Sequence, residues 1–449
     1  MSIRLGTSKQ EITPFQPVYL AGFSHRKEPF TEIKSKLYVR VFCFLDETNK
    51  NPSLLITADL IWWGSDLVSK LEKKIIEQFS IPAESIIFHA THNHSGPQTS
   101  KLFTSYLGRY SDSYIAFLEK QLLSAIEAAK QNAEEVTVQR ASSTADIGVN
   151  RRKAVNGKII MAPNTDGLVD NEVILVRFET LQQKTKALLI HYACHPTTTG
   201  NNYVSSEFPG TVLEEVEKRI GNGCIAGYLQ GCCGDIRPAL IKGNAFYRGE
   251  EEDVERLGKR LASNVLNCFN ENHWKEVATS KLQTSTKVLH LNFEHLPSRE
   301  FYDPSAFPED LLMKEWCTIM NERFSAFEAG VPLKLRLMTF GEELSFLSMN
   351  AEMVTQYGLK LKEKYGGRII PLPYSNGMIG YVPTAGQLSE GGYEANDSIY
   401  YFALPSPFSS SIENSINNAI DKLIRKEERE EYDGLSIHVQ GRSFKCKSI

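Results

Sequence analysis

Two short segments of this chain, residues 90–97 and 191–197, concentrate histidine next to turn-forming residues. The first reads Ala-Thr-His-Asn-His-Ser-Gly-Pro and the second reads His-Tyr-Ala-Cys-His-Pro-Thr. Together with the residue just before the first segment, they hold five of the ten histidines, which are His89, His92, His94, His191 and His195. Neutral imidazole is the commonest protein ligand for zinc, so this pattern points to a metal centre.

Each histidine segment follows an apolar, strand-like run, and open α/β sheets place their sites at the carboxyl ends of strands. In an extended segment His92 and His94 would point to the same side, where both could reach one ion. A following proline restricts the chain at His195, whereas His191 is expected to support the site or the core. Asp59, which ends another strand-like run, could accept a hydrogen bond from a ligand histidine or could form a turn or helix cap.

A third segment, residues 228–238, reads Tyr-Leu-Gln-Gly-Cys-Cys-Gly-Asp-Ile-Arg-Pro. Its glycines would let a substrate approach the backbone and could leave N–H groups free for a developing oxyanion. The adjacent thiols of Cys232 and Cys233 raise the alternative of a cysteine nucleophile. Neighbouring residues at a strand end face opposite sides, so at most one of the two thiols could serve.

Strand-like and helix-like patterns alternate along most of the chain. Apolar runs predict strands over 53–57, 85–89, 136–139, 173–178, 186–190, 224–229, 287–293, 334–339 and 344–347. Helical periodicity predicts helices over 66–79, 112–129, 210–220, 251–269, 309–327 and 352–364. This alternation predicts an α/β fold, with a mixed, partly parallel β-sheet core and flanking helices.

Composition narrows the classes of partner. The chain has 449 residues, 41% hydrophobic, with a formal net charge of −4 and no long basic tract, which argues against a nucleic-acid partner. No segment approaches a membrane span and the first residues lack the apolar core of a signal peptide, so we expect a cytoplasmic protein. The eight cysteines include no Cys-x-x-Cys pair and are expected to be reduced.

Several segments resemble, in the same order, those of the neutral/alkaline (non-lysosomal) ceramidase family, in its N-terminal catalytic domain. The matching segments are residues 5–7, 11–14, 90–97, 195–197, 234–238, 350–352, 380–384 and 390–392. The resemblance implies a ceramidase-like catalytic domain, which we expect over residues 1–430. Residues 431–449 would form a C-terminal tail, with no separate β-sandwich domain.

The resemblance also implies a ligand set. The family binds one catalytic zinc ion (Zn²⁺) through two histidines, a glutamate and a tyrosine, which match His92, His195, Glu352 and Tyr381. His94 matches a histidine near the scissile carbonyl, and Arg151 matches an active-site arginine. Without the resemblance, Glu352 reads as an acid in the first turn of a helix and Tyr381 as a loop aromatic.

At the position of Arg237 the family has a serine that is held to act as the nucleophile near the zinc. Because arginine cannot act in that way, the expected nucleophile is a water activated by the metal. Arg237 could instead hold a carboxylate or phosphate of the substrate. Asp235 could orient Arg237 or act as a base.

The sequence therefore predicts a zinc-dependent hydrolase that cleaves an amide, or an ester, of a small anionic substrate. Three alternatives stay open: a genuine ceramidase-type N-acyl amidohydrolase, a cysteine-dependent hydrolase, and a non-catalytic relative that binds a metal or ligand. The sequence does not define the oligomeric state.

Overall fold

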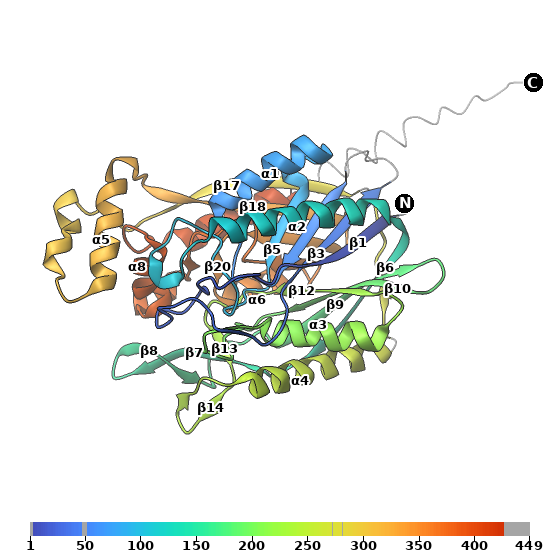
Figure 1. Cartoon of the computed structure of the whole chain (residues 1–449), viewed down its shortest axis with the longest axis horizontal. Helices are drawn as coiled ribbons and strands as arrows, with labels where there is room; N and C mark the ends of the chain where they lie inside the picture. Colours follow the sequence, from blue (N-terminus) through green and yellow to red (C-terminus); the bar gives the residue numbers. More distant parts are fainter. Residues whose placement is uncertain (1–2, 47–51, 272, 281, 426–449) are drawn as a thin grey trace, which may run out of the picture.

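The computed structural model describes residues 3–46, 52–271, 273–280 and 282–425 (Figure 1). Its largest sheet has nine strands, with the order β12-β10-β9-β6-β1-β3-β4-β5 and β16 paired with β6. The strands are β1 (Ile3–Glu11), β3 (Tyr38–Asp46), β4 (Ser53–Ala58), β5 (Ile86–Ala90), β6 (Glu134–Thr144), β9 (Glu172–Thr180), β10 (Thr185–Tyr192), β12 (Ile225–Gln230) and β16 (Lys275–Glu276). The pairs β4–β5 and β10–β12 are parallel and the other pairs are antiparallel. The predicted mixed, partly parallel sheet is confirmed.

Both faces of this sheet are covered, as its apolar strands require. In β4, Leu54 and Ile56 face one hydrophobic cluster, while Leu55 faces the other. The first cluster includes residues of four helices, α1 (Ser65–Phe79), α2 (Asp112–Gln131), α3 (Glu207–Ile220) and α4 (Glu251–Asn270). These helices therefore cover one face of the sheet, and all four had been predicted from their periodicity.

A second, four-stranded sheet covers the opposite face. It has the order β17 (Gln283–Asn292), β18 (Gly330–Gly341), β19 (Leu344–Met349) and β21 (Ile369–Leu372). Aromatic side chains join the two sheets, for example Phe44 of β3 and Phe340 of β18, whose ring centroids are 4.8 Å apart. Figure 1 shows α5 (Leu311–Arg323) at one end of the molecule, where it packs against α8 (Ser398–Phe402).

Further, mostly short elements lie outside these two sheets. They are β2 (Glu32–Ile33), β7 (Gly148–Val155), β8 (Lys158–Asn164), β11 (Tyr203–Val204), β13 (Ile236–Pro238), β14 (Ile241–Lys242), β15 (Ala245–Phe246), β20 (Glu352–Met353), α6 (Thr355–Lys364), β22 (Tyr381–Val382) and α7 (Ala385–Glu390). The prediction of a helix over 352–364 is wrong at its start, because Glu352 lies on β20 and the helix begins at Thr355. The predicted tail over 431–449 lies outside the described residues. Within the described residues, none of the helices combines the length and the apolar character that crossing a membrane requires.

Candidate metal centre

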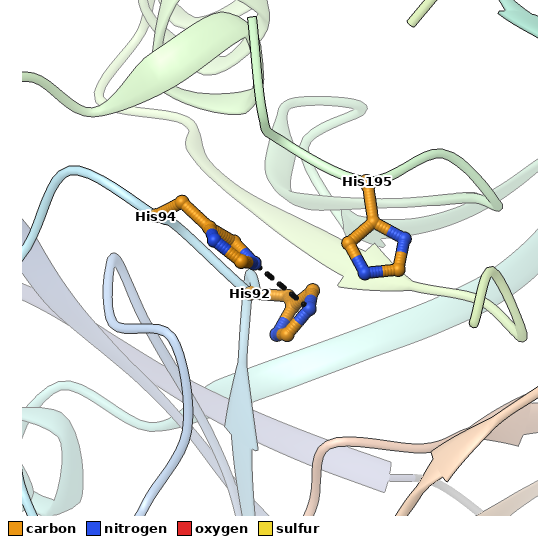
Figure 2. Close-up of side chains that lie close together, drawn as sticks. All are labelled: His92, His94 and His195. Carbon is orange, nitrogen blue, oxygen red and sulfur yellow. Dashed lines mark hydrogen bonds between the residues drawn. The ribbon is translucent and has the colours of Figure 1, made fainter. Parts of the chain in front are cut away.

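The first histidine segment turns into the site directly after β5. His92 has a positive φ of 63°, so the expected extended segment is wrong at this point. The prediction that both rings reach one point is confirmed: the His92 and His94 Nε2 atoms are 3.2 Å apart (Figure 2). The left-handed backbone conformation of His92, rather than the alternation of a strand, brings the two rings together. Arg26, which donates to the His94 carbonyl at 2.5 Å, holds this turn.

The second segment reaches the same point because the two edge strands of the main sheet meet. His89 of β5 accepts a hydrogen bond at Nε2 from the backbone of Gln230 in β12, at 2.8 Å. His195, in the loop after β10, therefore lies beside His92, with ring centroids 4.6 Å apart. Figure 2 shows the His92, His94 and His195 rings gathered from these two segments. His191 contributes to the core, with Nε2 3.2 Å from the Pro371 carbonyl oxygen.

Backbone carbonyls orient two of the three rings. His92 Nδ1 lies 2.9 Å from the Ile61 carbonyl oxygen, and His195 Nδ1 lies 2.6 Å from that of Cys233. A carbonyl only accepts, so each Nδ1 bears a proton, and in the neutral ring each Nε2 presents a lone pair. The alternative partner Asp59 is wrong, because its carboxylate accepts from the Tyr38 backbone and from Arg40.

Glu352 lies between these two lone pairs. Its Oε2 atom is 3.3 Å from His92 Nε2 and 3.4 Å from His195 Nε2. It is buried and has no hydrogen-bond partner among the described residues. The Tyr381 hydroxyl is 3.5 Å from His195 Nε2 and accepts from Arg151 Nη2 at 3.1 Å.

This arrangement fits a cation. Two imidazole lone pairs and a carboxylate oxygen, all acceptors, converge in a buried space, which is unfavourable unless a positive charge lies between them. Ligand atoms at about 2.0–2.2 Å from a tetrahedral zinc are about 3.3–3.6 Å apart, close to the separations seen here. The buried group of His92, His94 and His195 could hold a metal ion, with Glu352 and Tyr381 beside it.

The protonation states agree with this role. Burial lowers the pKa of His195 to about 4 and, with the neighbouring His92 and His195, places that of His94 well below its ordinary value. Burial alone would raise the pKa of Glu352, but the adjacent His92 and His195 hold it well below the usual range. Neutral imidazoles and an ionised carboxylate are the forms that bind metals.

Arg151 of β7 connects the site to a buried ion-pair network. Its Nε donates to Glu394 at 2.8 Å, while Arg152 Nη1 donates to the other oxygen of Glu394 at 2.6 Å. Because its charge is already paired, Arg151 is suited to hold the Tyr381 hydroxyl in place. Burial raises the pKa of the Tyr381 phenol, so this side chain stays neutral.

A cavity of about 270 Å³ opens beside His94 and Tyr381. Arg151 and Arg237 both line it. Asp235 is not among the described lining residues: its oxygens accept from the Thr355 backbone at 2.8 Å and from Gln387 at 3.0 Å. Asp235 thus joins segments behind the site.

The glycines and cysteines of the third segment, residues 231–234, have a structural role. The N–H groups of Gly231 and Gly234 donate to the carbonyls of Tyr192 and Met353, so the expectation that they are free for an oxyanion is wrong. Cys232 and Cys233 are buried, and burial raises the pKa of both thiols. This disfavours a thiolate nucleophile. The described cysteines are all free thiols, as expected.

Sequence reasoning missed several residues that shape the site. Tyr374 stacks on His92 with ring centroids 4.0 Å apart, and Phe23 packs on His94 at 5.1 Å. Arg248 lines the cavity and places its guanidinium 4.4 Å from the centre of the Phe23 ring. Each comes from a loop whose local sequence has no distinguishing pattern; only the charge of Arg248 could have drawn attention.

The chain is similar to known proteins both in its N-terminal sequence and in its fold. Residues 3–262 match the family described as "Neutral/alkaline non-lysosomal ceramidase, N-terminal". The structure of neutral ceramidase from Pseudomonas aeruginosa is similar, with a TM-score of 0.69 and 16% identity over 88% of this chain and 70% of that one. A structure titled "Ceramidase complexed with C2" gives a TM-score of 0.70 and 15% identity, over 91% of this chain and 73% of that one. The match covers more than half of the chain, and the chain therefore belongs to the neutral/alkaline non-lysosomal ceramidase family.

Proposed function

We propose that this protein is a zinc-dependent hydrolase that cleaves an amide bond, or an ester bond, of a small anionic molecule with water as the nucleophile. The observation that supports it most directly is the convergence of His92 Nε2, His195 Nε2 and Glu352 Oε2 in a buried space beside a cavity. Family membership supports amide hydrolysis as the reaction class.

Of the side chains that converge here, His92, His195, Glu352 and Tyr381 would hold the ion, and His94 would act on the substrate instead of serving as a ligand. Zinc, when bound, supplies a Lewis acid that activates water and polarises the scissile carbonyl. The chain arranges its own residues around that chemistry. His94 is neutral and lines the cavity, so it can take the proton of the attacking water or hydrogen-bond the developing oxyanion. Arg151 keeps Tyr381 in position through its hydrogen bond.

The anionic character of the substrate rests on Arg237. Its guanidinium lies over the Phe246 ring at 4.7 Å, lines the cavity and has no ion-pair partner among the described residues. A neutral ligand would leave this partly buried charge unpaired, which is unfavourable. An anionic ligand would pair with it.

A second candidate is ceramide hydrolysis, which the family membership favours. The test is a turnover screen of the purified, zinc-supplemented protein over anionic N-acyl amides, lactams and esters, with long-chain ceramide in parallel. We expect chelator-sensitive turnover of an anionic amide or ester and little turnover of ceramide.

Efficient ceramide hydrolysis would replace the proposal with the second candidate. Stoichiometric zinc without turnover of any of these bonds would instead indicate a non-catalytic relative. The Arg219→Gln variant, which changes an exposed arginine on α3, serves as a control for nonspecific charge effects in the screen.

A further inference from the structure

Two guanidinium groups line the cavity without a carboxylate to neutralise them. Arg237 reaches it from β13, and Arg248 reaches it from the loop between β15 and α4. Neither forms an ion pair with a residue in the described part of the chain. The third lining arginine, Arg151, differs because Glu394 pairs with it at 2.8 Å.

No aspartate or glutamate is present among the described residues that line this cavity. The lining does include hydroxyl groups that can donate to an anion, among them those of Ser24 and Thr197. Burial and the charges of Arg151 and Arg248 lower the pKa of Arg237 to about 10, the direction expected for cations that share one cavity. The site is therefore positively charged and lacks an internal counter-ion.

Arg248 is an exposed residue that contacts segments next to the metal centre. The backbone of the following residue, Gly249, donates to the Thr198 carbonyl at 2.8 Å, so Arg248 is tied to the loop that follows His195. Its guanidinium packs on Phe23 at 4.4 Å, and the same ring contacts His94 at 5.1 Å. A Cβ atom at Gly200 would approach the Arg248 Cδ and Nη1 atoms to 2.6 Å, so this glycine provides the space for the side chain.

We propose that Arg237 and Arg248 together bind a dianionic group of the substrate, a phosphate monoester or a pair of carboxylates, next to the scissile bond. The inference rests on the proposed hydrolytic function and defines its substrate class. One negative charge would neutralise only one guanidinium, whereas a dianion satisfies both, and the planar guanidinium fork suits carboxylate and phosphate oxygens. The cavity of about 270 Å³ suits a small molecule.

The test is calorimetric titration of the purified full chain with inorganic phosphate and, separately, with succinate. Each titration is run on chelator-treated and on zinc-loaded protein. Arg237→Met and Arg248→Met should each weaken binding by about tenfold or more, the scale of a lost charge-assisted hydrogen bond. Arg237→Lys and Arg248→Lys keep the charge and should weaken binding less, and Arg219→Met, at an exposed position of α3, should leave binding unchanged.

The two probes separate the two sources of a dianion: tighter phosphate binding indicates a phosphate monoester, and tighter succinate binding indicates a dicarboxylate. The inference is overturned if the wild-type protein binds neither probe. It is also overturned if binding appears only in the zinc-loaded protein and survives both methionine substitutions, because the anion would then contact the ion alone.

The lysine variants keep the test valid if a methionine variant unfolds, because they preserve the stacked, charged side chain. Arginine-dependent anion binding by a protein that holds no metal and turns over no substrate would refute only the hydrolase proposal. Zinc-dependent turnover with anion affinity independent of both arginines would refute only this inference.

Discussion

Glu352 and Tyr381 are register partners in the parallel ladder between β20 and β22, although the two strands are only two residues long. The ladder places a carboxylate and a phenol side by side, next to the two imidazole lone pairs of His92 and His195. Met353, the residue after Glu352, accepts a backbone hydrogen bond from Gly234 at 2.9 Å, which ties this ladder to the loop after β12.

Glu352→Gln should weaken zinc binding strongly, because the amide preserves the shape of the side chain and removes its negative charge. Residues outside the ligand shell change metal affinity by about 10–100-fold, so loss of this oxygen should cost about a hundredfold or more. Tyr381→Phe should cost less, because the phenol is neutral. Competition with a chromophoric chelator measures both affinities.

Glu363→Gln on α6 is the matched control, since this glutamate is exposed and lies away from the site. If Glu352→Gln binds zinc as tightly as Glu363→Gln does, Glu352 is not a ligand and the ladder has only a structural role.

His94→Ala should lower turnover of the substrate by about a hundredfold or more while the bound metal is retained. Cys233→Ser should retain substantial activity, because the Cys233 thiol is buried and does not line the cavity. Its sulfur atom forms a hydrogen bond with the Tyr374 hydroxyl, at 3.2 Å. Single-turnover kinetics and metal analysis on the same samples make the comparison. An inactive Cys233→Ser that keeps its fold and its metal would instead indicate a thiolate mechanism.

The metal-free protein should lose stability as the pH falls from about 6.5 toward 4. Burial lowers the pKa of His89 to about 3 and that of His195 to about 4, from an ordinary value of 6.5. In this window the unfolded chain binds protons that the folded chain does not, so the free energy of unfolding rises with pH. Each such histidine contributes up to about 1.4 kcal/mol per pH unit.

Carboxyl groups whose pKa is raised by burial oppose this trend, and Glu207 is one of them. Burial raises the pKa of Glu207 to about 7, so the folded chain takes up one proton at that carboxyl as the pH falls. In the Glu207→Gln variant, the free energy of unfolding should therefore decrease more steeply as the pH falls. Urea unfolding in the presence of chelator, at several pH values, measures the slope, and stability that stays constant or increases on acidification would contradict the prediction.

The sequence predicted those parts of the fold that have strong local patterns. The strands and helices around the two histidine segments follow from apolar runs and helical periodicity, as in β4, β5 and α2. The central strand β3 was not predicted, although residues 41–45 form an apolar run directly after the charged Arg40. The structure explains this charge by its ion pair with the buried Asp59, at 3.1 Å.

The candidate site was predicted only in part from the residues themselves. The clustering of His92, His94 and His195 could be inferred from spacing and strand ends. Glu352 and Tyr381 came only through family resemblance, because a two-residue ladder between distant segments has no local signal. Arg248 was not found, since apart from its charge it has no local signal and its position depends on tertiary pairing of its loop with the segment after His195.

The most direct test of the central claim is the metal content of the purified chain, measured by mass spectrometry together with protein concentration. We expect close to one zinc per chain in the wild type and in His290→Ala, which changes an exposed histidine. We expect little or none in His92→Ala and His195→Ala, because each change removes one of the converging ligand atoms. Full metal content in both of these variants, or a wild-type protein that binds no zinc when it is supplied, would contradict the account.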